Sequence, residues 1–351
     1  MKTTDTTDTT GTSGRTGGTT GADDAADGNG LTGTAGGRRG LLHGLPWLVW
    51  RRHRTLLCAA LLATVVGCIT FAYQRIGVQD FLHNHPATSD PDGELLTEFQ
   101  RYGSMFSSDL SFLESLPVLA GIFLGAPLIA GELEHGTVKL VTTQSVSRTR
   151  WIAAALGLPL AVAVLCSTLL SAAFTWLWAP AHGLAASGDW LTNGPFDATG
   201  PVPVAKTLFL TACGIALGML IKRVVPAMAA TLALALVTSV VWAEQIRPRL
   251  GTLRSVSYPY DSDDGPSLPF ASVRMDDWVS TADGKLYGFS TCTDSGTAAA
   301  CRAKLGIVNR VTQYFDYEQM AGMQWLGAGI LLALSAVVLA FIVWRTHRRP
   351  L

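Results

Sequence analysis

The chain has 351 residues, of which 48% are hydrophobic and 15% are charged, and its formal net charge is zero. This composition is too apolar for an ordinary soluble domain of this length and indicates a polytopic membrane protein. Because acidic and basic residues balance, no overall electrostatic field favours a nucleic acid as partner.

The first forty residues form a polar segment with twelve Thr and eleven Gly. Such a segment buries too little apolar surface to offset its ordering entropy, so we predict that residues 1–40 are a disordered tail. Residues 41–54 combine leucine and tryptophan with basic side chains, which is typical of an amphipathic helix at the membrane interface. The alternative is a simple positively charged flank of the first membrane span.

Six apolar stretches are long enough to cross a membrane as helices, since about 18 residues reach roughly 27 Å of the roughly 30 Å hydrocarbon core. They are Leu56–Tyr73, Leu113–Ala130, Trp151–Trp178, Val204–Ile221, Val224–Trp242 and Trp325–Trp344. We predict an all-α membrane protein with six transmembrane helices. Residues 55–243 then hold spans one to five, residues 244–320 form a loop domain, and residues 321–351 hold span six and the chain end.

The short loops predict the orientation of these spans. Lys and Arg cluster before span one, between spans two and three, between spans four and five, and after span six, which are all on one side. The positive-inside rule therefore makes both termini cytoplasmic and the 244–320 loop domain extracellular. The excess of Arg over Lys, 20 against 6, fits a GC-rich bacterial genome as the source. We expect this multi-pass protein in the inner (plasma) membrane.

Motifs of catalysis and of metal or cofactor binding are absent from the sequence. No GxxxxGK[ST], HExxH or GxSxG motif and no CxxC pair occurs, so we predict no catalytic residue, cofactor or metal site. The spans carry essentially no carboxylate or lysine at mid-depth, which argues against an ion-coupled carrier. An acidic and histidine cluster in the first outer loop is irregularly spaced, and we favour a solvated loop over a metal site there. Its members are Asp80, His83, His85, Asp90 and Asp92.

A charged island, residues 131–150, separates spans two and three. It contains Glu132, Glu134, His135, Lys139, Arg148 and Arg150. Paired charges at the rim of a loop set the register and choice of a binding partner, so we predict that the island docks on another protein. The alternative is that these side chains only anchor the ends of the two neighbouring spans.

The island resembles the signature of ABC-2 type transporter permeases: an acidic pair, a Gly-Thr step, an apolar and threonine-rich stretch, and a Ser-Arg step before the next span. The matching positions are Glu132, Glu134, Gly136, Thr137, Ser147 and Arg148. The resemblance extends to the six-span layout and to Trp47–Arg54, whereas the Thr/Gly tail and the long outer loop depart from the family. It implies that the island is a coupling helix resting on an ATP-binding subunit. The implied coupling residues are Glu132, Glu134, His135, Gly136, Thr137, Lys139, Ser147 and Arg148.

This resemblance implies the membrane subunit of an ABC exporter, with ATP hydrolysed by a separate partner and not by this chain. It also implies a second permease copy, or a related permease, beside it in the lipid bilayer. The mostly apolar spans favour a hydrophobic or amphipathic cargo. The alternative from another functional class is a non-transporting sensor or scaffold whose extracellular loop binds a ligand.

Two pairs of glycines predict close contacts between helices. Gly121 and Gly125 on span two, and Gly214 and Gly218 on span four, are each four residues apart and allow close helix packing. We expect those contacts within one subunit more than between two.

The cysteines Cys292 and Cys301 lie in a polar part of the outer loop. If that loop faces an oxidising space, a disulfide between them persists and stabilises the loop by about 2–3 kcal/mol. Strand-like residues near 284–290 complete the prediction of a small folded cap.

Overall fold

The computed structural model describes most of the chain after its N-terminal segment. Residues 1–44 lie outside the described residues, so the predicted disorder of the Thr/Gly tail stays a prediction. The described ranges are 45–85, 99–134, 148–183, 189–192, 194–262, 265–293 and 297–348.

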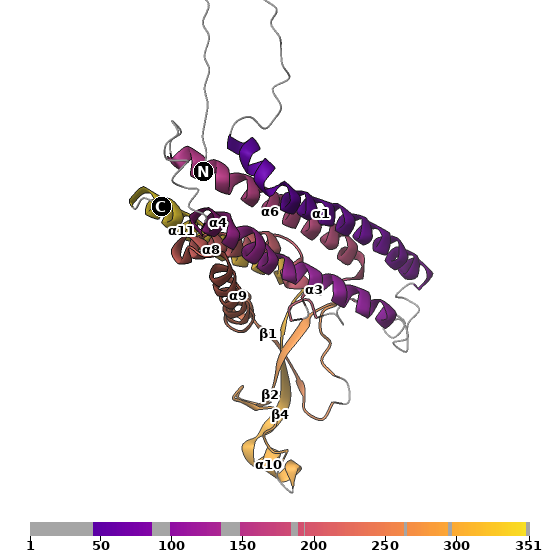
Figure 1. The fold of residues 1–351 in the computed structure, drawn as a ribbon. Helices are drawn as coiled ribbons and strands as arrows, with labels where there is room; N and C mark the ends of the chain where they lie inside the picture. The colour runs from indigo at the N-terminus through magenta and orange to yellow at the C-terminus, as the bar shows by residue number, and fades with distance from the viewer. Residues whose placement is uncertain are drawn as a thin grey trace, which may run out of the picture. The chain divides into compact units, whose positions relative to one another are not determined.

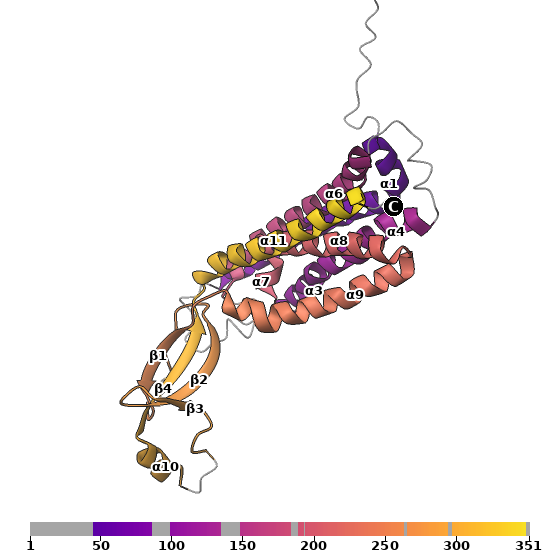
Figure 2. The ribbon, with the colours of Figure 1, turned by 90° about the vertical axis from the view of Figure 1, so that its left-hand side faces the viewer.

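Long helices make up most of the described structure (Figures 1 and 2). They are α1 (Leu45–Asn84), α3 (Gly103–Leu119), α4 (Ala126–Glu134), α6 (Arg148–Trp178), α8 (Val202–Ile221), α9 (Val224–Val241) and α11 (Gln319–Arg348). The π-helix η3 (Ala120–Gly125) joins α3 to α4 without a break. The shorter helices are η2 (Gln100–Tyr102), η4 (Ala179–Ala181), α7 (Pro195–Ala198), η6 (Trp242–Ile246), η7 (Arg247–Arg249) and α10 (Ala298–Leu305).

Six helical stretches in the described part of the chain are long and apolar enough to cross a membrane. They are Arg54–Asn84, Gln100–Glu134, Leu156–Ala181, Val202–Ile221, Val224–Arg249 and Gln319–Arg348. Each coincides with one predicted span, so six helices of spanning length, in the predicted order, are confirmed. Helix α1 also runs unbroken through residues 45–54, whose position at the membrane interface stays a prediction.

The helices differ in how much of their surface other helices cover. In the most apolar stretch of α8, 61% of the residues are buried, against 17% in α1 and in α9. Val225 and Val240 of α9 are 75% and 62% exposed. Water-soluble proteins rarely expose such contiguous apolar faces, whereas hydrocarbon solvates them. Helix α8 is therefore the centre of the bundle, and α1 and α9 lie at its rim.

Aromatic packing joins the first three spans. Helices α1 and α6 lie side by side in both ribbon views (Figures 1 and 2). Phe174 of α6 packs edge-on against Phe71 of α1, with 5.5 Å between ring centroids, and against Phe106 of α3 at 6.5 Å. All three rings are at most 2% exposed. Because a buried aromatic side chain contributes a large apolar area, this contact holds the three helices together.

A four-stranded antiparallel sheet follows the fifth span. Its strands are β1 (Arg254–Pro259), β2 (Val273–Thr281), β3 (Leu286–Gly288) and β4 (Ile307–Phe315), in the order β1-β4-β2-β3. Central β4 pairs with β1 and β2 and leads into α11. The prediction of an all-α protein is therefore incomplete. Segments 254–259 and 273–281 mix β-branched and aromatic residues with polar ones, which favours strands in a loop outside the helices.

The predicted disulfide between Cys292 and Cys301 is present. It closes the segment that joins β3 to α10, with the two Cα atoms 5.6 Å apart. Helix α10 contains no buried residue, so apolar packing contributes little to its position. The covalent bridge is therefore a main constraint on this helix.

Candidate functional site

The charged island begins in α4 and ends in α6. Glu132 and Glu134 lie in the last turn of α4, and Arg148 is the first residue of α6. The other predicted coupling residues, His135, Gly136, Thr137, Lys139 and Ser147, lie outside the described residues. The docking surface as a whole therefore stays a prediction, while its attachment to the spans is part of the structure.

Glu134 connects this island to the turn between α8 and α9. Its Oε2 atom accepts a hydrogen bond from the backbone N–H of Val224 at 2.9 Å. Val224 is the first residue of α9, and the first amides of a helix have no partner within that helix. A carboxylate at this position also interacts favourably with the positive end of the helix dipole. Glu134 thus links the end of the second span to the start of the fifth.

The four predicted packing glycines meet at one crossing between η3 and α8. A Cβ atom on Gly125 would lie 2.6 Å from the carbonyl oxygen of Thr211, and one on Gly121 would lie 3.0 Å from that of Leu210. From the other side, Gly214 and Gly218 face the backbone of η3 and α4. Distances this short leave little or no room for a side chain, so glycine lets the two backbones approach within one chain.

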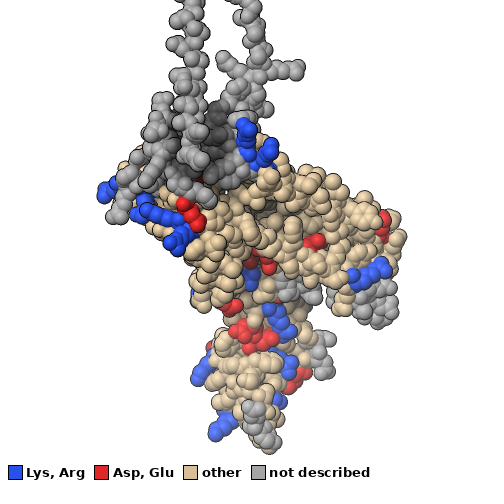
Figure 3. All heavy atoms as spheres, viewed as in Figure 1, with Lys and Arg blue, Asp and Glu red and all other residues tan. Residues whose placement is uncertain are grey.

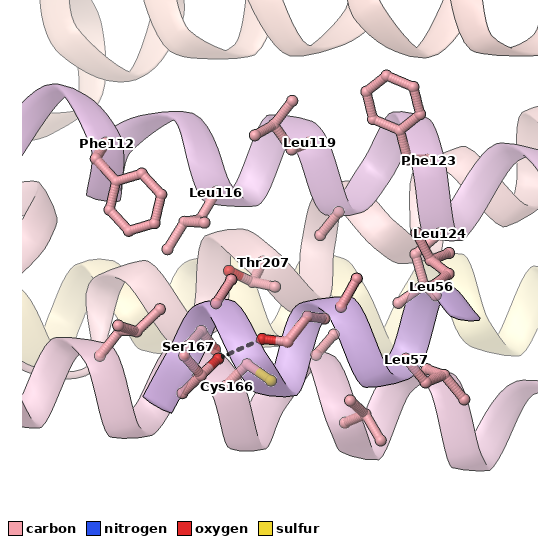
Figure 4. Close-up of a pocket in the computed structure, with 18 residues that line it drawn as sticks. Leu56, Leu57, Phe112, Leu116, Leu119, Phe123, Leu124, Cys166, Ser167 and Thr207 are labelled. Atoms are coloured by element: carbon pink, nitrogen blue, oxygen red, sulfur yellow. Dashed lines mark hydrogen bonds between the residues drawn. The ribbon is translucent and has the colours of Figure 1, made fainter. Parts of the chain in front are cut away.

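An apolar groove of about 420 Å³ lies between α1, the α3–η3 run and α6. In Figure 4, Phe112 and Leu116 stand on one wall, Cys166 and Ser167 on the opposite wall, and Thr207 of α8 behind them. No Asp, Glu, Lys or Arg is among the residues that line it. Its volume falls in the range of small-molecule sites, roughly 300–1,000 Å³.

A buried charge cluster surrounds Asp197 of α7, at the opposite end of α8 from the Val224 turn. The Oδ1 atom of Asp197 accepts a hydrogen bond from Trp242 Nε1 at 2.7 Å and pairs with Lys206 Nζ at 2.9 Å. Its Oδ2 atom accepts a hydrogen bond from Arg247 at 3.1 Å. Asp197 and Arg247 are 7% and 8% exposed. The carboxylate therefore ties α7 to α8 and to the end of the fifth span.

Gln324 adds the sixth span to the same region. Its Nε2 atom lies 3.0 Å from the carbonyl oxygen of Phe196 and 3.1 Å from that of Thr199. Trp190, on the other side of α7, donates from Nε1 to the carbonyl oxygen of Ala271, next to β2, at 3.0 Å. The residues around α7 thus contact three spans and the sheet region.

The charge cluster was not predicted from the sequence. Lys206 lies one turn inside the fourth span, near its end and not at mid-depth, where the sequence predicts essentially no lysine. The available signal was a single lysine within the apolar run Val202–Ile221, because such a charge requires a partner. Asp197 precedes Lys206 by nine residues but carries no motif, and Arg247, which it also pairs with, lies 50 residues away.

The acidic and histidine cluster of the first outer loop is only partly described. Asp80 and His83 belong to the last turns of α1, and Asp90 and Asp92 lie outside the described residues. Within the described ranges, no group of three or more His, Cys, Asp and Glu side chains could hold a metal ion.

Comparison with known proteins places these features in a family. The family model for the ABC-2 membrane transporter related domain matches residues 61–247, more than half of the chain. Searches of curated proteins and of solved structures found no match. The matched region runs from the first span through the fifth and includes the charged island and the glycine crossing. Membership of this family implies a multi-pass membrane component that associates with an ABC ATP-binding subunit. The chain thus belongs to the ABC-2 membrane transporter related family.

Proposed function

We propose that the chain is the permease subunit of an ABC exporter, which moves a hydrophobic or amphipathic compound out of the cell. The family match over residues 61–247 carries this proposal. The absence of a phosphate-binding loop from the sequence supports a separate subunit as the site of ATP hydrolysis. The small number of charged side chains in the spans supports an apolar cargo.

The structure supports a route for movement from the island into the bundle. A force on residues 131–150 acts directly on α4 and, through the Glu134–Val224 hydrogen bond, on α9. The glycine crossing transmits displacement of η3 to α8, because touching backbones cannot slide without repacking. Helix α8 carries Lys206, whose ion pair with Asp197 reaches α7. Alternating access then corresponds to a shift of these packed helices between two arrangements.

The same proposal includes a second copy or a related permease as neighbour. The exposed apolar faces of α1 and α9 support this partner, because they offer surface that a helix of another subunit can cover. We further propose that the chain lies in the inner (plasma) membrane, with both termini cytoplasmic and the sheet outside the cell. The basic clusters in the short loops and the disulfide in the sheet region support this orientation.

Co-expression with an ABC ATPase, sought first in the neighbouring reading frames, tests the proposed function. The two proteins should purify as a complex that hydrolyses ATP faster than the ATPase alone. If they neither associate nor alter hydrolysis, the permease proposal is wrong and the sensor or scaffold alternative replaces it.

Variants at Glu134 separate its two contributions. Glu134→Gln keeps an oxygen that can accept the Val224 hydrogen bond but removes the charge, whereas Glu134→Lys removes both. If the charge docks on the ATPase, both variants lose the stimulated hydrolysis, and only Glu134→Lys also lowers the thermal-unfolding midpoint. Unchanged stimulation in Glu134→Gln would leave this residue only the role of capping α9.

A further inference from the structure

The apolar groove is reached from the side of the bundle. Four large apolar side chains that line it are partly exposed: Leu56 (37%), Phe112 (40%), Leu119 (43%) and Phe123 (51%). These residues belong to α1 and to the α3–η3 run, both within candidate membrane spans. The opening therefore faces the hydrocarbon of the bilayer, and its occupant arrives from within the membrane.

The lining offers hydrocarbon contacts and almost no hydrogen bonds. The hydroxyl of Thr64 donates to Ala60 O at 2.8 Å, and that of Ser167 donates to Val164 O at 3.1 Å. The hydroxyl of Thr207 donates to Pro203 O at 2.7 Å. Each of these hydroxyls already donates to a backbone carbonyl of its own helix. The groove therefore favours an alkyl chain over a polar ligand.

The dimensions of the groove favour a single extended chain over a helix. A helix is about 10–12 Å wide with its side chains, so a segment of about 12 Å would occupy roughly 900 Å³ or more. The groove holds 420 Å³. Its floor on α1 consists of small residues, Ala59, Ala60 and Ala63, which leave a slot rather than a broad surface.

A basic residue stands beside one end of the groove. Arg54 is exposed and precedes Leu57, a lining residue, by three positions, so both lie on one face of α1. Arg51 lies one turn earlier, and Figure 3 shows basic side chains gathered at this end of the helix. Apolar lining with a cation at its mouth matches an alkyl chain that carries an anionic head group.

We propose that this groove binds one acyl chain of an anionic phospholipid, whose head group lies in the leaflet beside Arg54. The lipid fills the space between α1, α3 and α6 and thereby completes their packing. This site is independent of the proposed transport, because a resident lipid is required neither to cross the membrane nor to respond to ATP.

Photolabelling of the purified full-length protein tests the proposal. The protein is placed in phosphatidylcholine nanodiscs with a small fraction of phosphatidylglycerol that carries a diazirine in one acyl chain. After illumination, mass spectrometry should find label concentrated in residues 56–64, 112–124 and 162–170. An excess of unlabelled phosphatidylglycerol should suppress this labelling, because a site saturates and bulk lipid contact does not.

Two variants on α1 form a matched pair. Ala60→Trp fills the groove and should reduce its labelling roughly tenfold, since the loss of contact with about two methylenes suffices for that change. Leu62 is 65% exposed and does not line the groove, so Leu62→Trp should leave the labelling unchanged. Arg54→Gln should reduce the preference for phosphatidylglycerol over an equally labelled phosphatidylcholine by roughly fivefold.

Three results would overturn the proposal. The first is label spread as densely over Val237 and Val240, exposed residues of α9, as over the groove. The second is labelling in the wild-type protein that unlabelled lipid does not suppress, a measurement that does not depend on whether a variant folds. The third is a cross-link from residues 56–64 to another copy of the chain, which would make that copy the occupant.

Discussion

Asp197 joins several elements of the described part of the chain. It neutralises Lys206 and Arg247 and accepts a hydrogen bond from Trp242, so one side chain satisfies donors from three elements. A buried charge that loses its partner is more costly than the intact pair is stabilising. The effect of a substitution therefore depends on which charges remain.

We predict that Asp197→Ala destabilises the protein by about 3–5 kcal/mol, because it removes the carboxylate that pairs with the buried Arg247 and the half-buried Lys206. The thermal-unfolding midpoint in detergent should fall, and Asp197→Ala with Lys206→Met should recover part of that loss. Asp283→Ala is the control, since this carboxylate lies exposed in the turn after β2, where a surface charge contributes about 1 kcal/mol or less. Equal effects of Asp197→Ala and Asp283→Ala would show that the cluster does not stabilise the fold.

At the scale of elements, the close crossing of η3 and α8 predicts that one added methyl group lowers the stability of the protein. Gly125→Ala places a methyl group 2.6 Å from a backbone oxygen and forces the helices apart, at a cost of about 2 kcal/mol. The unfolding midpoint should then fall by roughly 4–8 °C. Gly329→Ala on α11 is the control, because nothing lies within 4 Å of the added carbon. If both substitutions behave alike, the crossing is looser than the structure describes.

The disulfide should act locally. We predict that Cys292→Ser combined with Cys301→Ser raises the rate of proteolysis between β3 and α10 at least about tenfold, because the bridge contributes about 2–3 kcal/mol. The midpoint for unfolding of the spans should not change, since the bridge lies within the sheet region. Limited proteolysis followed by mass spectrometry locates the cut. A simultaneous loss of span stability would mean that the bridge supports more than its own loop.

At the scale of the whole molecule, the proposed orientation is tested by labelling single cysteines. The four free cysteines are first replaced, with Cys292 and Cys301 retained. A cysteine at Asp283, in the exposed turn after β2, should react with an impermeant maleimide in intact cells. A cysteine at Arg223, in the turn before α9, should react only after permeabilisation. Reaction of both from the same side would invalidate the six-span topology.

Much of the bundle was predictable because a membrane span is a local property of the sequence. About 18 consecutive apolar residues suffice to identify one, and each of the predicted spans corresponds to a helix. The pairing of Cys292 with Cys301 was also predictable, since the two residues are close in sequence. The cluster around Asp197 was not, because its members are brought together by the packing of α7, α8, η6 and η7.

The groove also could not be predicted from the sequence. It depends on the space left between three helices, and a hydropathy pattern does not distinguish a lipid-facing alanine from one that lines a slot. The role of Glu134 in capping α9 has the same origin, since Val224 is 90 residues away.

The base of the sheet, where β1 and β4 join the bundle, has a consequence for how related chains can differ in this region. Strand β1, which follows the fifth span, pairs with β4, which precedes the sixth, and Arg254 stands opposite Tyr314. Arg254 also pairs with Asp316 at 2.5 Å. The polypeptide therefore leaves and re-enters the bundle at nearly one point, where Val273 and Phe315 at the base of the sheet pack into the core of the bundle. Beyond that base, the outer part of the sheet and α10 could vary without moving either helix, and the family match ends at residue 247, just before this region begins.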